Sequence, residues 1–420
     1  MPKQLHKSFR DAQIRDLFAR YTRKEIKLAH LTAIFKIGRS RIFALLNRYK
    51  EDPEGFTVNY RRCNAPHRIA PEIEENILRE LRIEKKLILD PQIKLWSYNY
   101  SYIRDRLRDQ YGQRVSVPTI IRKAKSGGFY LRKPVRRAHT REVLTNYIGE
   151  LIQHDSSHHL WAPAAGTKWH LITSLDDHSR YILYADLAER ETSWDHISAL
   201  ESLILCWGIP FSFYTDSHSI FRFVQGRDSH CRRHHLLTDG VDPQWKQVIR
   251  DLGIEVRHAL SPQAKGKIER PYGWLQDRLV RTCSREDVRT IDEGRQVLRA
   301  ELERYNNRQV HSTTGEIPAV RFQRARKEKR SLFREFMIPP PFLSTKDIFC
   351  LRLERVVDAY RTVRIRDLSF RLKGVDPREP VQMRIVFRRD QDLAEIRFWH
   401  EKTYLGTQRA KLEDFEGVRF

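Results

Sequence analysis

Three short runs between Gly149 and Thr282 decide the fold: Leu151-Ile152-Gln153-His154-Asp155, Phe211-Ser212-Phe213-Tyr214-Thr215-Asp216 and Lys265-Gly266-Lys267-Ile268-Glu269. The first two runs are short and largely apolar, which is typical of buried strands, and an aspartate closes each one. The third run opens an amphipathic helix. Because open α/β sheets carry their chemistry where strands end, Asp155, Asp216 and Glu269 are predicted to form one site.

An α/β pattern fills the space between the two aspartates. Residues 170–176 and 181–187 predict two strands joined by a hairpin turn at 177–180. Ser193 is the expected N-cap of a helix that ends at Gly208-Ile209-Pro210. The next strand ends at Asp216, so strand, helix and strand are expected to form a right-handed crossover between paired parallel strands.

Three carboxylates at one sheet edge suit hard divalent cations, which bind carboxylates together with phosphate oxygens and water. Two such ions about 3.5–4 Å apart activate the attacking oxygen and stabilise the leaving one at phosphorus. Taken alone, Asp155 or Asp216 is more often a turn residue or helix cap, and only the combination with Glu269 favours catalysis. Asp176 and Asp177 are expected to shape the hairpin.

Four motifs in order resemble the core of DD-E insertion-sequence transposases, most closely the ISNCY type. They are His154-Asp155-Ser156-Ser157-His158-His159-Leu160-Trp161, Asp176-Asp177-His178-Ser179-Arg180, Tyr214-Thr215-Asp216-Ser217-His218-Ser219-Ile220-Phe221-Arg222 and Ser261-Pro262-Gln263-Ala264-Lys265-Gly266-Lys267-Ile268-Glu269-Arg270. The resemblance covers residues 150–325 and implies a ribonuclease H-like fold, shared with retroviral integrases. It further implies that Asp155, Asp216 and Glu269 are the catalytic triad and bind two Mg²⁺ or Mn²⁺ ions.

Two features depart from the family pattern. Ser156 follows the first acid where the family commonly has Gly, which adds a side chain beside the expected metal site. The second and third acids are 269 − 216 = 53 residues apart, a longer spacer than in integrases. The excess is the polar segment 225–242, which we interpret as a surface insertion.

The bulk composition indicates a nucleic-acid partner. The chain has 420 residues and a formal net charge of +24, which predicts two to four domains and a polyanionic ligand. It contains neither an apolar run of about 18 residues nor a signal peptide, so a cytoplasmic, nucleoid-associated protein is expected. The five scattered cysteines suggest no disulfide framework, and the His- and Cys-containing segment 230–235 is interpreted as a solvated basic loop rather than a zinc site.

Two helical segments are predicted to bind double-stranded DNA. Residues 1–55 and 68–130 each show helix-turn-helix spacing, although an ordinary helical bundle with a solvated basic face would share it. Ser116 is the expected cap of the second reading helix. Lys265 and Lys267 flank the third acid and could hold phosphates. The candidate DNA contacts are Arg39, Ser40, Arg41, Thr119, Arg122, Lys123, Lys125, Lys265 and Lys267.

The last segment, 343–412, alternates apolar with polar or basic residues over five short stretches, which predicts half-buried antiparallel strands. It resembles the small C-terminal β-barrel of integrase-like transposases. The fold class is therefore multidomain: N-terminal all-α helix-turn-helix domains, a central α/β ribonuclease H-like (integrase core) domain at 145–325, and a C-terminal small β-barrel.

These features together predict a transposase that binds the terminal inverted repeats of a mobile DNA element, then cuts and joins DNA. Both element ends must be handled together, so at least a homodimer on DNA is expected. Two alternatives stay open. One is a catalytically inactive, transposase-derived DNA-binding protein; the other is a ribonuclease H-type hydrolase of RNA–DNA hybrids, which two helix-turn-helix units disfavour.

Overall fold

The computed structural model describes residues 5, 8–59, 69–131, 145–215, 243–258, 266–415 and 418, without the side chains of 258 and 266–270. The chain divides into two compact units, Met1–Glu74 and Glu75–Phe420. No described helix is long and apolar enough to cross a membrane.

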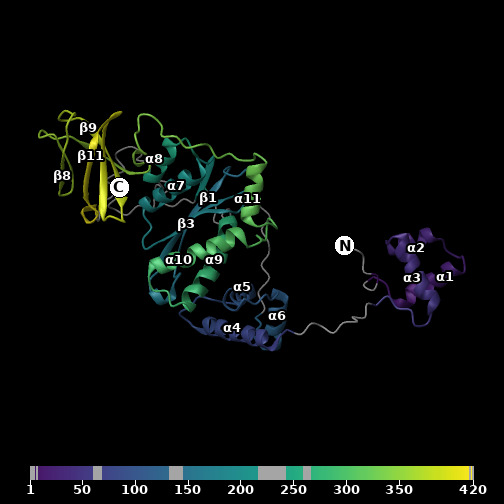
Figure 1. The fold of residues 1–420 in the computed structure, drawn as a ribbon. Helices are drawn as coiled ribbons and strands as arrows, with labels where there is room; N and C mark the ends of the chain where they lie inside the picture. The colour runs from purple at the N-terminus through teal and green to yellow at the C-terminus, as the bar shows by residue number, and fades with distance from the viewer. Residues whose placement is uncertain are drawn as a thin grey trace. The chain divides into compact units, whose positions relative to one another are not determined.

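The first unit is built on three helices: α1 (Asp11–Thr22), α2 (Leu28–Phe35) and α3 (Arg39–Glu51) (Figure 1). Its core is aromatic, with Phe18 in ring contact with Phe35 and Phe56. Lys36 adopts a left-handed backbone with φ 51° and ends α2, so that α3 can start three residues later. The predicted succession of helix, turn and basic helix is confirmed here.

The boundary between the units falls within α4 (Pro71–Leu89), and the second unit continues with α5 (Tyr100–Tyr111) and α6 (Val117–Ser126). The Asn99 side chain accepts a hydrogen bond from the Tyr102 N–H and caps α5, and Gly112 ends that helix with φ 64°. Ile103, Leu107 and Ile120 are fully buried where α5 packs on α6. Ser116 is the N-cap residue of α6, as predicted.

A five-stranded sheet lies at the centre of this unit, in the order β3-β2-β1-β4-β5. Its strands are β1 (Ile152–His159), β2 (Trp169–Asp176), β3 (Ile182–Ala188), β4 (Ser212–Thr215) and β5 (Glu255–His258). Strands β1, β2 and β3 are antiparallel neighbours, whereas β4 is parallel to both β1 and β5. The predicted central α/β domain is thus confirmed as a mixed sheet.

The predicted crossover needs a correction. The helix α7 (Ser193–Trp207) does connect β3 with β4, but these strands are not paired, because β2 and β1 lie between them. The parallel partners of β4 are β1 and β5. The N-cap of α7 is Thr192 rather than Ser193, and Thr192 forms a capping box with Asp195.

Helices cover the two faces of the central sheet (Figure 1). On one face, Ile152 and Phe213 pack against α7 and α8 (Gln244–Asp251) through Leu200 and Trp245. On the other face, β2 packs against α9 (Gly266–Arg285) and α10 (Ile291–Asn307), followed by α11 (Pro318–Lys327). The predicted amphipathic helix after the third acid is confirmed, because Leu275, Leu279 and Val280 of α9 are buried.

The C-terminal segment is not a closed barrel, contrary to prediction. It forms a four-stranded antiparallel sheet in the order β11-β10-β9-β6 and a separate two-stranded hairpin of β7 and β8. The strand β11 (Thr403–Lys411) was not predicted, because its polar sequence suits an exposed edge rather than a half-buried strand. The remaining strands are β6 (Leu351–Val356), β7 (Thr362–Ile365), β8 (Leu368–Arg371), β9 (Pro380–Arg388) and β10 (Leu393–His400).

Short 3₁₀ turns complete the described elements: η2 (Pro163–Ala165), η5 (Thr345–Asp347) and η6 (Glu413–Phe415). The C-terminal sheet shares one hydrophobic core with α7 and α8. Trp194 of α7 contacts Phe387 of β9, and Arg352 of β6 forms a salt bridge with Asp251 of α8. The sheet is therefore packed on the central domain and is not a free appendage.

Candidate active site

Asp155 lies in the middle of β1, as its fourth residue, and not at the end of a strand as predicted. Strand β1 changes from buried to partly exposed at this residue. Side chains alternate along a strand, so Asp155 faces the α9 side while His154 and Ser156 face α7 and α8. The carboxylate is thus half-buried on the face that α9 covers.

Two hydrogen bonds join α9 to the sheet around Asp155. Thr173 of β2 lies directly opposite Asp155, and its hydroxyl is 2.8 Å from the Tyr272 hydroxyl of α9. One turn further along the helix, the Gln276 amide is 2.9 Å from Nε2 of His159, at the end of β1. Burial and the charges of Lys94 and Lys168 lower the pKa of His159, which favours a neutral ring at this contact.

The structure covers the three predicted acids unequally. Asp155 is described in full. Glu269 lies in the first turn of α9, three residues before Tyr272, but its side chain and that of Lys267 are not described. Asp216 and Lys265 lie outside the described residues, as does the predicted insertion 225–242. No group of three His, Cys, Asp or Glu side chains placed to hold a metal ion occurs within the described ranges.

Behind Asp155, a polar cluster that sequence reasoning missed joins β1 to α7. His154 is hydrogen bonded to Ser174 Oγ at 2.9 Å and to His196 Nδ1 at 2.8 Å, and its ring stacks on Trp245. His196 Nε2 in turn lies 2.9 Å from a carboxylate oxygen of Glu191. A histidine among the buried residues of α7, most of which are apolar, was the available signal. The cluster fixes α7 against the strand that carries the first acid.

Ser156, the departure from the family pattern, belongs to this cluster. Its hydroxyl donates a hydrogen bond to Glu191, and it therefore points away from the Asp155 face. The other Glu191 oxygen lies 3.4 Å from Nδ1 of His170, whose pKa is lowered by burial against the opposing effect of that carboxylate. The added side chain does not crowd the face that carries Asp155.

Asp176 and Asp177 shape the hairpin, as predicted. Asp176 is fully buried and accepts hydrogen bonds from the backbone N–H groups of Gly149 and Ser179. Asp177 pairs with Arg180 at 2.8 Å and also accepts a hydrogen bond from Gln153. Both carboxylates are therefore committed to the turn between β2 and β3.

The described DNA-contact candidates lie in the first turn of α3 and along α6, where Lys123 and Lys125 are in the last turn. Arg39, Ser40 and Arg41 are all exposed in the first turn of α3. On α6, Arg122 and Lys125 are exposed, while Thr119 and Lys123 are half-buried. The Lys125 ammonium lies 4.8 Å from the centre of the Tyr130 ring.

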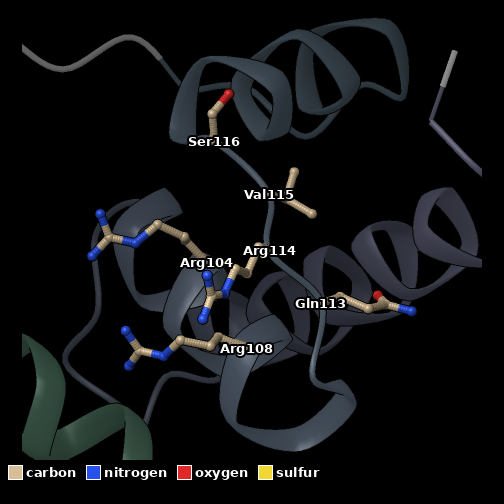
Figure 2. Close-up of a pocket in the computed structure, with 6 residues that line it drawn as sticks. All are labelled: Arg104, Arg108, Gln113, Arg114, Val115 and Ser116. Carbon is tan, nitrogen blue, oxygen red and sulfur yellow. The ribbon is translucent and has the colours of Figure 1, made fainter. Parts of the chain in front are cut away.

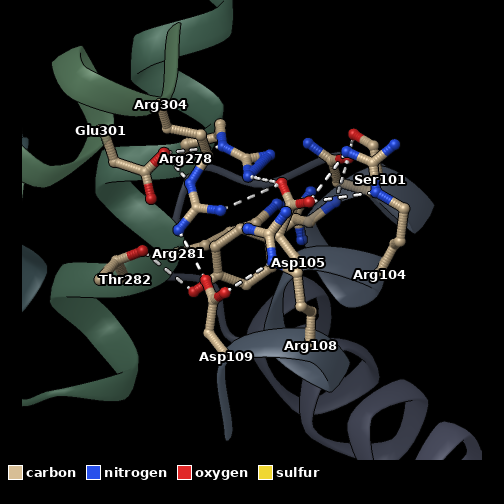
Figure 3. Close-up of polar contacts among 12 residues, drawn as sticks. Ser101, Arg104, Asp105, Arg108, Asp109, Arg278, Arg281, Thr282, Glu301 and Arg304 are labelled. Atoms are coloured by element: carbon tan, nitrogen blue, oxygen red, sulfur yellow. Dashed lines mark hydrogen bonds and ion pairs between the residues drawn. The ribbon is translucent and has the colours of Figure 1, made fainter. Parts of the chain in front are cut away.

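Helix α9 also holds the α4–α6 segment through buried ion pairs. Arg281 of α9 and Glu84 of α4 are both fully buried and paired, and Arg285 pairs with Glu80 at 2.6 Å. Arg278 of α9 pairs with Asp105 of α5 and with Glu301 of α10 (Figure 3). The α4–α6 segment, which is the predicted second helix-turn-helix unit, is therefore packed on α9, the helix that contains Glu269.

No protein-family model matches the chain, but two curated proteins that resemble it are transposases. The chain is 30% identical over 259 residues to "Putative transposase y4bF" of Sinorhizobium fredii, covering 61% of this chain and 52% of that protein. It is 28% identical over 290 residues to the transposase for insertion sequence IS1202 of Streptococcus pneumoniae, covering 68% and 54% respectively. The chain spans about half the length of these curated relatives.

Among solved structures, a chain of the simian T-cell lymphotropic virus intasome in complex with PP2A regulatory subunit B56 gamma is 17% identical. The matched region covers 71% of this chain and 89% of the intasome chain, with a TM-score of 0.33. The HTLV-2 integrase catalytic core domain in complex with magnesium is 18% identical. The matched region covers 41% of this chain and 95% of that domain, with a TM-score of 0.30. The resemblance to insertion-sequence transposases is confirmed by the two curated relatives.

Proposed function

From this similarity to insertion-sequence transposases, we propose that the chain is a DD-E transposase: it binds the terminal inverted repeats of a mobile DNA element and catalyses metal-dependent strand cleavage and strand transfer. The single observation that carries the proposal is the position of Asp155. It lies on a ribonuclease H-like sheet, opposite Thr173, which is hydrogen bonded to Tyr272 in the first turns of α9.

The same contact supports a role for Glu269. Glu269 precedes Tyr272 by three residues in α9, and residues with this spacing on a helix are neighbours. A helix that binds Thr173 through Tyr272 thus brings its first turn towards the strand pair that carries Asp155. We infer that Glu269 and Asp155 act together.

Strand register supports the inclusion of Asp216. Gln153 of β1 is paired with Tyr214 of β4, and each of these residues precedes a predicted acid by two positions. From this matching spacing we infer that Asp216 belongs to the same site as Asp155. The three acids are those that the family resemblance assigns to the triad.

Three carboxylates from a strand, a strand end and a helix start fit Mg²⁺ or Mn²⁺, which prefer oxygen ligands. Bound there, two such ions would activate the attacking hydroxyl and neutralise charge at the scissile phosphate. The role of the surrounding residues is to hold the acids in position. Thr173 and Tyr272 fix α9 to β2, and the His154–His196 pair fixes α7 behind β1.

Exposed basic residues supply the proposed DNA contacts. Arg39 and Arg41 lie at the start of α3, and Arg122 and Lys125 are exposed on α6. In helix-turn-helix proteins, the early residues of the second helix contact base edges in the major groove. The net charge of +24 favours association with nucleoid DNA, and joining two ends requires at least two copies on DNA.

The test is incubation of the purified full chain with a labelled duplex carrying the end of its element, with Mg²⁺ or with EDTA. Nicking and joining are expected with Mg²⁺ only, and are expected to disappear in Asp155→Asn, Asp216→Asn and Glu269→Gln. Glu255→Gln is the matched control, because Glu255 is an exposed acid on the same sheet. A Glu269→Gln protein that cuts as well as the parent would overturn the proposal.

Two other outcomes have clear meanings. Tight, salt-sensitive binding of duplex DNA by the parent without any cutting would favour the catalytically inactive DNA-binding protein. Cleavage of an RNA–DNA hybrid in preference to a duplex end would favour the ribonuclease H-type hydrolase.

A further inference from the structure

A hollow of about 230 Å³ lies between α5 and the turn that leads into α6 (Figure 2). Three of its lining side chains are arginines, and no acidic side chain of the described residues lines it. In Figure 2 the three guanidinium groups lie on one side of the turn, whereas Gln113 points to the other. The lining residues are Arg104, Arg108, Gln113, Arg114, Val115 and Ser116.

Two of these arginines lie at the two ends of a network of ion pairs that extends from α5 to the catalytic domain (Figure 3). Arg104 pairs with Asp105 and Arg108 pairs with Asp109, both at 2.8–2.9 Å on α5. The same two aspartates also pair with arginines of α9 and α10. This ion-pair network comprises Arg104, Asp105, Arg278, Glu301, Arg304, Asp109 and Arg108.

The positive and negative charges of this ion-pair network do not balance. Its four guanidiniums outnumber its three carboxylates by one. Arg114 adds a second positive charge at the hollow, since it is exposed and forms no ion pair with any described residue. An anion would offset this excess, because the nearby carboxylates are already shared between two or three arginines.

One of the lining arginines also has an unused hydrogen-bond donor. Nη2 of Arg108 is buried and has no acceptor within the part of the chain that the structure describes. A guanidinium presents its N–H donors in a planar fork that matches the oxygens of a phosphate. Three such groups around one hollow therefore suit a phosphate better than a carboxylate or a halide.

We propose that this hollow binds a backbone phosphate of duplex DNA beside the reading helix α6. The inference rests on the proposed function, which makes DNA the polyanion that this segment meets. The turn that carries Arg114 leads directly into α6, so a phosphate held here would fix the position of α6 along the duplex. Phosphate contacts of this kind set register and orientation, and base contacts then supply sequence preference.

The test compares Arg114→Gln with Arg82→Gln in the full chain. Both arginines are exposed on the α4–α6 segment, but Arg82 does not line the hollow. The dissociation constant is measured for a duplex with the element's end and for an unrelated duplex, across a range of salt concentrations. Calorimetry with inorganic phosphate alone is run beside it, with circular dichroism to check folding.

Arg114→Gln is expected to weaken binding of both duplexes about tenfold, the size of a lost charge-assisted hydrogen bond, and to reduce the salt dependence by about one phosphate contact. Arg82→Gln should change neither. Equal effects of the two substitutions on duplex binding would overturn the site while leaving the proposed function standing. Binding of inorganic phosphate that Arg114→Gln abolishes, with duplex affinity unchanged, would also overturn the assignment to DNA. A parent chain that binds no duplex would overturn both proposals.

Discussion

The hydroxyl groups of Thr173 and Tyr272 lie 2.8 Å apart, which joins β2 to α9 directly opposite Asp155. Ninety-nine residues separate the two in sequence. Both side chains are buried, so water does not replace the bond easily if one partner is removed. The contact thus joins α9, whose first turn contains Glu269, to the strand paired with the one that carries Asp155.

Loss of this tie should affect chemistry more than DNA binding. Tyr272→Phe keeps the ring but removes the hydroxyl, which leaves Thr173 without this partner and should cost about 1 kcal/mol of stability. We expect strand cleavage to fall about tenfold through misplacement of α9, while affinity for duplex DNA stays within twofold of the parent. Single-turnover cleavage and binding assays measure the two effects.

Tyr305→Phe is the matched control for that experiment. Tyr305 lies buried on α10, and its hydroxyl has no hydrogen-bond partner among the described residues. Its removal should therefore leave both cleavage and stability near the parent values. Equal losses of cleavage in the two variants would contradict a specific role for the Thr173–Tyr272 bond.

Ser156 should matter for stability and little for catalysis, because its hydroxyl binds Glu191 on the face of β1 away from Asp155. Ser156→Ala should lower the free energy of unfolding by about 1 kcal/mol. Ser156→Gly, which restores the common family residue, should cost about 0.5–1 kcal/mol more, because glycine weakens a strand. Urea unfolding gives these values; a large loss of cleavage in Ser156→Ala at unchanged stability would argue that the hydroxyl serves the reaction.

The buried pair of Arg281 and Glu84 should hold the α4–α6 segment on α9. Arg281→Met alone leaves a buried carboxylate without its main partner, which typically costs about 3–5 kcal/mol. The double variant Arg281→Met with Glu84→Leu removes both charges and should recover most of this loss. Limited proteolysis of the α4–α6 segment, together with thermal unfolding, follows both effects. Additive losses in the double variant would show that the pairing itself is unimportant.

Asp176 should make stability depend on pH. Burial raises the pKa of its carboxyl from 3.8 to about 6, although hydrogen bonds from Ser179 and Gly149 oppose this. Between these values the folded chain binds more protons than the unfolded chain, so the contribution of Asp176 is complete below about pH 4 and is lost as the pH rises through about 6.

The matched variant is Asp176→Asn, which cannot titrate. The difference in free energy of unfolding between parent and variant should fall by up to about 3 kcal/mol from about pH 4 to about pH 7. Urea unfolding at several pH values measures this difference. Parallel pH curves for the two proteins would show that Asp176 does not titrate in this range.

Local pattern was a good guide wherever an element depends on its own residues. The hairpin of β2 and β3, the amphipathic helix α9 and the helices α3 and α6 were all predicted, because apolar spacing and turn residues are local properties. The edge strand β11 was missed for the same reason. Its polar residues face solvent, so little in the sequence distinguishes it from a loop.

By itself, the sequence determined the residues of the proposed site, namely the order and spacing of Asp155, Asp216 and Glu269, and the basic charge that favours a nucleic-acid partner. Only the tertiary structure decided which elements meet. It paired β4 with β1 instead of β3, turned Ser156 towards Glu191, and docked α5 on α9 through Asp105 and Arg278. These contacts join residues that are tens to hundreds of positions apart, and their stability comes from burial and pairing that no local pattern encodes.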